Sequence, residues 1–284
     1  EIMPSLVGSE MCIRDSSYGV EVAAAWNDRI ADFSYQIGGQ LSFNRNKIIE
    51  MNEEYRLYDY QKRTGQSLGQ IFGYEVEGIY QSQEEIDQRE VKQYLGVVRP
   101  GDLKFKDQNG DKKIDKYDAV PMGYNETCPE LYFGFNLGAE YKGLGFMAQF
   151  QGVSHYSKYL NTNSVYRPLT GNSTISQYYW DNRWSQDTPN GTLPRLTTQG
   201  SDNNYNVNSL WVTDASFLKL RTLELYYQMP ERWMKKAGFV KGVKLYARGH
   251  DLFSLDGIDI ADPEALGTTH PTMRQYTFGF NLQF

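Results

Sequence analysis

Five side chains that carry oxygen recur within one short stretch of this 284-residue sequence. They stand at positions 1, 3, 5, 9 and 12 of the stretch and are Asp107, Asn109, Asp111, Asp115 and Asp118. Carboxylate and amide oxygens are the ligands that a hard divalent cation prefers, and the backbone carbonyl of Lys113, at position 7, could add another. The spacing therefore predicts a calcium loop, with the apolar Ile114 anchoring it inward.

Two residues of this loop depart from the EF-hand pattern that its spacing follows. Position 6 is Lys112, where glycine usually permits the sharp turn, and position 12 is Asp118, which reaches less far than glutamate. The spacing is closest to the dockerin variant, which ends in aspartate. Because Asp, Asn and Gly also favour turns by themselves, a surface turn without an ion is the alternative interpretation.

No other group of residues points to catalysis. His155, His250 and His270 stand in unrelated contexts with no ligand spacing between them. Glu84 and Glu85 are adjacent, so one helix face cannot present both as a glycosidase pair. The sequence contains no glycine-rich phosphate loop, nucleophile elbow or HExxH motif. We therefore expect a protein that is not an enzyme.

Composition argues against several further classes of protein. The net charge of −6 argues against a nucleic-acid partner. The mean hydropathy is −0.62, and no stretch is apolar over the length of a membrane-spanning helix. Cys12 and Cys128 lie far apart in the sequence, outside any metal or redox spacing, so a disulfide framework is not indicated.

Strict alternation of apolar and polar residues dominates the rest of the chain. At the C-terminal end, one strand face would carry Tyr276, Phe278, Phe280, Leu282 and Phe284. The same period of two recurs in the runs 18–26, 33–44, 131–141, 144–151, 217–229 and 243–248. A soluble β-sandwich also alternates. However, Gly, Ser, Asn and Gln on the polar faces and flanking Tyr, Phe and Trp favour a membrane barrel, whose outer face meets lipid.

Connection lengths give the orientation of these strands. The turns at 27–32, 142–143 and 230–242 are short, whereas loops at about 45–130, 155–215 and 254–272 are long. Membrane barrels have short periplasmic turns and long extracellular loops, which places the C-terminus in the periplasm. The strands alternate in direction in this way only if the run 72–80 does not cross the membrane and belongs to an extracellular loop. A capping box opened by Ser82 predicts a helix over 82–95.

The fold class expected is therefore all-β, the C-terminal portion of a transmembrane antiparallel β-barrel. It would contribute seven strands, which must pair with further strands because bacterial barrels use even numbers. One strand departs from the alternation, because Lys219 and Arg221 would lie on the same strand face as the apolar Leu223. Either that strand begins above the membrane or a bulge near Thr222 changes its register, and we prefer the first explanation.

The first sixteen residues read differently from the rest. They do not alternate, and they lack the basic start and apolar core of a signal peptide. The run SLVGSEMCIRDS is similar to translated adapter sequence, so we interpret residues 1–16 as a non-native leader. Residues 17–284 are then the barrel portion.

Several segments resemble the SusC/RagA family of TonB-linked outer-membrane proteins, the TonB-dependent receptors. The first is PGDLKFKDQNGDKKID at 100–115, followed by VPMG at 120–123. The others, in chain order, are FGYEVEGIYQSQ at 72–83, YFGFNLGAEYKGLGFMAQFQG at 132–152, DASFLKL at 214–220 and VKLYARGHDLF at 243–253. Together they extend over nearly everything after Tyr18.

The resemblance implies a 22-stranded barrel with an N-terminal plug, the plug and early strands lying outside this sequence. It also implies TonB-coupled import of oligosaccharides or peptides across the outer membrane of Bacteroidetes, with a SusD-like lipoprotein as partner and TonB contacting the missing N-terminal region. The alternatives are a soluble glycan-binding β protein with a dockerin-like calcium loop, or a passive porin or adhesin. Within the loop 155–215, candidate substrate or partner contacts are Tyr178, Tyr179, Trp180 and Trp184. Packing of the loops on each other is the alternative role for these aromatic residues.

Overall fold

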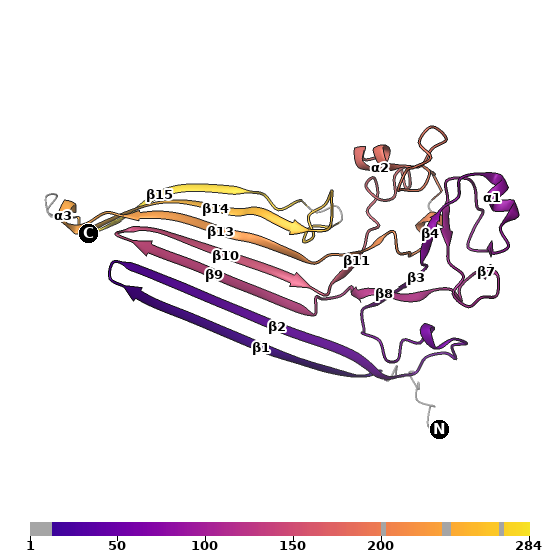
Figure 1. The fold of residues 1–284 in the computed structure, drawn as a ribbon, viewed down its shortest axis with the longest axis horizontal. Coiled ribbons are helices and arrows are strands. Elements are labelled where there is room, and N and C mark those ends of the chain that lie inside the picture. Colours follow the sequence, from indigo (N-terminus) through magenta and orange to yellow (C-terminus); the bar gives the residue numbers. More distant parts are fainter. Residues whose placement is uncertain (1–12, 200–202, 235–239, 267–269) are drawn as a thin grey trace, which may run out of the picture. The chain divides into compact units, whose positions relative to one another are not determined.

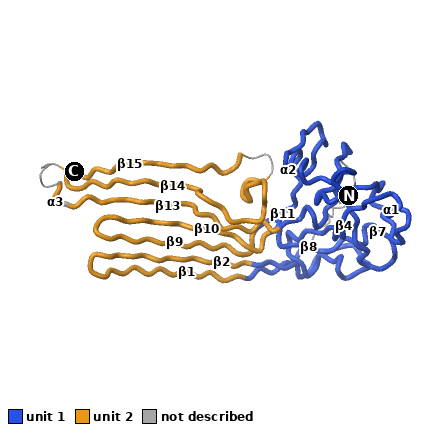
Figure 2. Tube along the Cα trace, turned by 45° about the horizontal axis from the view of Figure 1, so that its top comes forward, with its two compact units in different colours: residues 1–18, 45–128, 157–213 blue, residues 19–44, 129–156, 214–284 orange. Residues whose placement is uncertain are grey.

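The computed structural model describes residues 13–199, 203–234, 240–266 and 270–284. These residues form two compact units. Residues 19–44, 129–156 and 214–284 make up the sheet unit, and residues 1–18, 45–128 and 157–213 make up the loop unit (Figure 2). The loop unit is thus built largely from the two long segments that connect β2 to β9 and β10 to β13.

The sheet unit contains one seven-stranded sheet in which strands follow each other in chain order (Figure 1). The strands are β1 (Ile13–Ile30), β2 (Phe33–Met51), β9 (Leu131–Tyr141), β10 (Leu144–Ser154), β13 (Phe217–Gln228), β14 (Gly242–Asp256) and β15 (Gln275–Gln283). The neighbours from β2 to β15 pair antiparallel. A short helix, α3 (Glu231–Met234), follows β13. The all-β fold and the seven alternating strands expected from the sequence are confirmed.

Two tight turns join the strands. The β9–β10 turn uses Lys142 and Gly143, whose φ angles of 52° and 86° are both positive, as a type I′ turn requires. The β1–β2 turn uses Ala31, with φ 55°, and Asp32. We expected a wider turn over 27–32, but β1 continues to Ile30 because a two-residue turn suffices.

The long connections begin later than expected. Strand β2 continues to Met51 and β14 to Asp256, past the predicted loop starts at 45 and 254. At the other end of the chain, β1 begins at Ile13, so residues 13–16 of the expected leader lie in a strand. Residues 1–12 of that leader lie outside the described residues.

Strand β13 corrects our preference for a strand that starts above the membrane. Thr222 pairs with Gln149 but Leu220 pairs with Phe150, so Arg221 is an extra residue at a β-bulge. A second irregularity faces it in β14, where Asp251 has φ 49°. The bulge changes the register, which puts Lys219 on the polar face, opposite Gln151. Of the two explanations, the β-bulge near Thr222 is therefore the correct one.

The loop unit has only short elements. Its strands are β3 (Gln70–Gly73), β4 (Val76–Ile79), β5 (Lys92–Gln93), β6 (Leu103–Phe105), β7 (Lys113–Ile114), β8 (Val120–Asn125), β11 (Ser157–Tyr159) and β12 (Val212–Asp214). Its helical turns are η1 (Asp59–Gln61), α1 (Gln83–Gln88), α2 (Gln177–Asn182) and η2 (Asn203–Tyr205). As expected, the run 72–80 lies here and not in the seven-stranded sheet.

Helix α1 begins as predicted but ends early. Ser82 caps it by accepting the Glu85 backbone N–H at 3.2 Å. The helix stops at Gln88 because Arg89 is extended and its guanidinium donates to the Phe105 carbonyl at 2.7 Å. Residues 92–93 then pair with β7, so the predicted helix over 82–95 is too long.

Two apolar clusters hold the loop unit together. One contains the buried residues Leu103, Phe105 and Ile114, so Ile114 does anchor the acidic loop inward. The other lies in the 157–213 segment and contains Tyr166, Tyr179, Leu193 and Trp211. In the described part of the chain, no helix is both long enough and apolar enough to cross a membrane.

Candidate functional site

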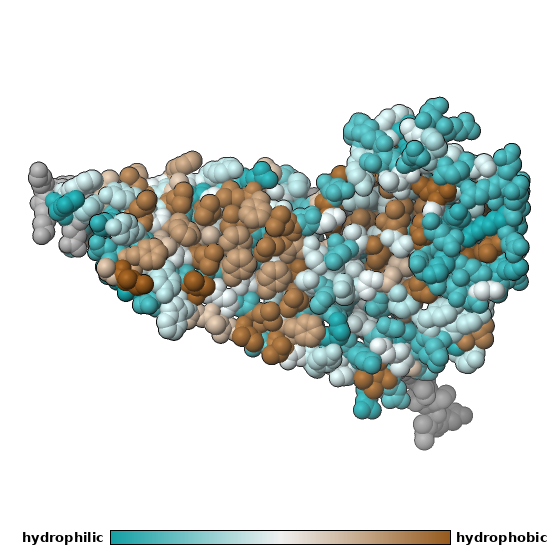
Figure 3. Space-filling view, viewed as in Figure 1, coloured by the Kyte–Doolittle hydropathy of each residue, from teal (hydrophilic) through white to brown (hydrophobic). Residues whose placement is uncertain are grey.

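The strand register separates the sheet into two chemically different faces. Phe146 lies between Ala139 and Leu225 on neighbouring strands, and this apolar pattern continues across the sheet. Many of its side chains are exposed, although burial usually favours large apolar groups. The exposed members include Val22, Trp26, Ile37, Leu41, Phe146, Leu225, Leu245, Phe278 and Phe280. Apolar side chains gather over the strands in Figure 3. Such a continuous patch marks a surface that contacts another protein or a membrane.

The opposite face is polar and carries its charges in pairs. Glu224 is buried and accepts bonds from Lys244 at 2.8 Å and from the Arg248 Nε at 2.7 Å. The Tyr226 hydroxyl donates to Glu140 at 2.7 Å. Because the charges are matched, this face can sit beside water without an uncompensated buried ion.

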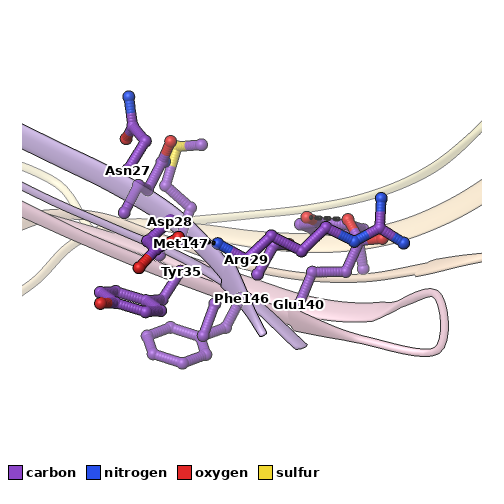
Figure 4. A pocket seen from close by; sticks show the side chains of 12 residues that line it. Asn27, Asp28, Arg29, Tyr35, Glu140, Phe146 and Met147 are labelled. Atoms are coloured by element: carbon purple, nitrogen blue, oxygen red, sulfur yellow. Dashed lines mark hydrogen bonds between the residues drawn. The ribbon is translucent and has the colours of Figure 1, made fainter. Parts of the chain in front are cut away.

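A hollow lies on the sheet near the β1–β2 turn (Figure 4). Its lining includes Arg29 and Glu140 together with the rings of Tyr35 and Phe146. Two glycines, one on β10 and one on β15, permit close packing on the polar face. A Cβ at Gly145 would lie 2.3 Å from the Tyr226 ring, and one at Gly279 would lie 2.5 Å from the Tyr246 hydroxyl. These glycines let the tyrosines lie along the sheet.

The predicted calcium loop uses its acidic oxygens to bind its own backbone. Asp107 accepts the N–H groups of Gly110 at 2.7 Å and Lys112 at 2.8 Å. Both oxygens of Asp118 accept backbone N–H groups, from Gln108 at 2.9 Å and Asp115 at 2.8 Å. These bonds define the turns of the loop, as in Asx turns.

Two further details bear on this loop. Lys112, the residue that replaces the usual glycine, has φ 65°, so the sharp turn forms despite the side chain. Burial raises the pKa of the Asp118 carboxyl, with smaller contributions from Asp107 and Asp115 that the backbone hydrogen bonds oppose. Among the described residues, no three His, Cys, Asp or Glu side chains gather closely enough to hold a metal ion.

The calcium site stays a prediction, and calorimetry on the folded protein tests it. If the loop binds calcium, the double variant Asp107→Ala, Asp111→Ala removes two charged ligands and should abolish the heat of calcium binding. Asp59→Ala, at an exposed pair outside the loop, is the matched control. An unchanged calcium isotherm in the double variant rejects the site and leaves the ion-free turn as the interpretation.

The aromatic residues proposed as contacts separate into two groups. Tyr179 is fully buried in the apolar cluster and donates to the Pro194 carbonyl at 3.2 Å. Trp184 is also buried, and its indole donates to Gln81 at 2.9 Å. Trp180 is 48% exposed, with the Arg183 guanidinium 3.4 Å from the centre of its ring, and Tyr178 is half-buried. Of the four, Trp180 is the one best placed to meet a ligand.

Sequence reasoning missed a buried polar network that joins the two long loops. Asp102 is fully buried and forms an ion pair with Arg195, whose Nε lies 2.6 Å from its carboxylate. The same carboxylate accepts from the Asn204 side chain at 2.9 Å and from the Arg99 backbone at 2.8 Å. Asn204 in turn accepts the Leu103 N–H at 2.8 Å. The PGD triplet at 100–102 was the sequence feature that could have indicated this network, but the side chains that bind Asp102 lie far along the chain.

Comparison with known proteins finds relatives of this sequence and of this fold. No family model matches the sequence. TonB-dependent receptor P26 of Formosa agariphila is 28% identical over 91% of the chain, and TonB-dependent receptor P3 of the same organism is 27% identical over 89%. The RagAB peptide transporter superposes on 95% of the chain with a TM-score of 0.69 at 19% identity. The sequence is therefore similar to TonB-dependent receptors, and the fold is that of part of the RagAB transporter chain.

This chain spans only part of the length of its relatives. It matches 28% of the length of P26, 27% of P3 and 29% of the RagAB transporter chain. The RagAB peptide importer in the 'open-open' state gives the same fold, with a TM-score of 0.67 over 96% of the chain. The likeness extends to both units, since it covers nearly the whole chain.

Proposed function

We propose that this chain is part of an outer-membrane transporter that imports oligosaccharides or peptides with energy from TonB. The observation that carries the proposal is the seven-stranded sheet, apolar on one face and charge-matched on the other. A wall of this kind separates lipid from an aqueous passage. The names of the relatives, TonB-dependent receptors, support the same activity.

The orientation and the partner belong to the same proposal. The tight β1–β2 and β9–β10 turns would face the periplasm together with the C-terminus, and the loop unit would lie outside the cell. A SusD-like lipoprotein would cap that loop unit, and TonB would engage a region outside this sequence. The likeness to RagAB, a peptide transporter, favours peptides, whereas the exposed Trp180 offers a stacking face suited to sugars.

Uptake measurements in a strain that lacks the native gene test this proposal. The complete receptor should fractionate with outer membranes and restore uptake of its cognate oligosaccharide or peptide. Dissipating the proton-motive force should stop that uptake, because TonB coupling depends on it. Uptake that continues at the same rate without the proton-motive force would mean passive diffusion through a porin-like pore, and a well-folded protein in the soluble fraction would contradict membrane residence.

A further inference from the structure

The bulge in β13 brings two cations to the polar face of the sheet. Lys219 is only 2% exposed, and its ammonium lies 5.4 Å from the centre of the buried Phe217 ring. The Arg221 guanidinium lies 5.9 Å from the same ring and donates to the Gln151 side chain at 3.0 Å. A lysine buried beside an aromatic ring needs a compensating anion, because removing its charge from water is costly.

The connection between β14 and β15 supplies those anions. The Lys219 Nζ lies 2.5 Å from Asp262 and 2.8 Å from Glu264. Glu264 also pairs with Arg221, which makes a further ion pair with Asp251 at 2.9 Å. The cluster therefore holds two cations and three carboxylates, and two of those carboxylates come from the connection. Among the described residues, Lys219 has ion pairs only with these two connection residues.

The backbone of the connection forms a turn that orients the carboxylates of Asp262 and Glu264. The Glu264 N–H donates to the Asp262 carboxylate at 3.0 Å, and the Ala265 N–H donates to the Asp262 carbonyl at 2.9 Å. These bonds form a tight Asx turn that points both carboxylates toward β13. Nearby Ile258 is also buried, so the connection has an apolar contact as well as an ionic one.

The ionisation of Asp262 supports a lasting contact. Burial raises the pKa of its carboxyl, but hydrogen bonds from Lys219 and Thr272 outweigh burial and bring the pKa to about 2. A carboxyl whose pKa is depressed from 3.8 stabilises the folded state fully above that ordinary value and loses the effect as the pH falls toward 2. The Asp262 carboxyl is therefore ionised at neutral pH, as its ion pair with Lys219 requires.

We propose that Asp262 and Glu264 form a built-in clamp that fastens the β14–β15 connection to the polar face of β13. The bulge and the clamp are one device, because the bulge places Lys219 on this face and the acids compensate its charge. The clamp makes residues 257–266 of the connection a fixed part of that face. Its consequence for a transported solute, a permanently narrowed passage, rests on the proposed function.

Hydrogen exchange on the complete receptor tests the clamp directly. In the double variant Asp262→Asn, Glu264→Gln, the introduced asparagine can still accept the backbone N–H of position 264, so the turn remains while the ion pairs are lost. We expect the Ala265 amide to exchange at least about tenfold faster than in the unaltered protein. Asp259→Asn is the matched control, because Asp259 lies in the same connection, is exposed and makes no ion pair with any described residue.

The outcomes are distinct. Faster exchange in the double variant and not in the Asp259 variant supports the clamp, whereas equal exchange in all three proteins overturns it. The amides of β13 and β14 report whether the double variant has folded. If it has not, acetylation of lysines in the unaltered receptor decides, since clamped Lys219 should react at least about tenfold more slowly than Lys142, which is 62% exposed. Equal reaction rates overturn the clamp. Neither readout depends on uptake, so the proposed function can fail separately.

Discussion

Arginine in place of Ile37 is expected to prevent stable assembly of the receptor in the outer membrane. Ile37 is 53% exposed on the apolar face, opposite Leu137 of the neighbouring strand. It lies a few residues beyond the β1–β2 turn, near the middle of the length that a tilted strand needs to cross lipid. An arginine on a lipid-facing wall costs about 2–4 kcal/mol at the bilayer midplane, a large share of the stability of a protein.

Gln40→Arg is the matched control for that substitution. Gln40 lies on the same strand but on the polar face, where it is exposed opposite Gly134. The same charge there meets water, so the amount of folded protein should stay close to that of the unaltered receptor. The measurement is heat-modifiable migration of outer-membrane fractions on gels, followed by urea titration in lipid vesicles. Equal loss in both variants, or none in either, would show that the face with Ile37 does not meet lipid.

The strands could be predicted from the sequence because alternate residues of each strand lie on the apolar and on the polar face of the sheet. The run from Leu131 to Tyr141 coincides with β9, and the run from Leu144 begins where β10 begins. Period two cannot locate an inserted residue, however. The bulge at Arg221 leaves the composition of the strand unchanged and only reverses which face its earlier residues occupy.

The partners of polar residues could not be predicted, because they come from distant parts of the chain. Lys219 pairs with Asp262 and Glu264, which follow it after another whole strand. Asp102 pairs with Arg195, and no local pattern relates the two. The acidic loop shows a related limit. Its spacing predicts a cation site, yet the same carboxylates make a set of backbone hydrogen bonds, so spacing alone does not distinguish the two uses.

The Asp102 network raises the question of why two long loops fold as one unit. The apolar clusters of the loop unit are small, and most of its strands are only a few residues long. Between its two long segments, Asp102 binds both Arg195 and Asn204, and Leu103 binds Asn204. A buried polar network of this kind gives such a unit a single arrangement that weak apolar packing alone would not specify.

Alanine in place of Asp102 is therefore expected to unfold the loop unit while leaving the sheet intact. Loss of the carboxylate leaves Arg195, whose side chain is 17% exposed, without its anion, and removes the acceptor of the Arg99 N–H and of Asn204. Breaking a buried pair in this way costs about 3–5 kcal/mol. Limited proteolysis of the assembled receptor should then cleave within residues 45–128 and 157–213.

Two matched variants decide whether the effect belongs to this network. Asp59→Ala removes the acid of an exposed pair with Lys62 in the same unit, and such pairs contribute little, so its cleavage pattern should match that of the unaltered receptor. Asp102→Asn keeps the shape and the hydrogen-bond acceptor but not the charge, and should fall between the two. If Asp102→Ala resists protease as well as Asp59→Ala does, the two loops are held together by their apolar clusters and not by the buried charge.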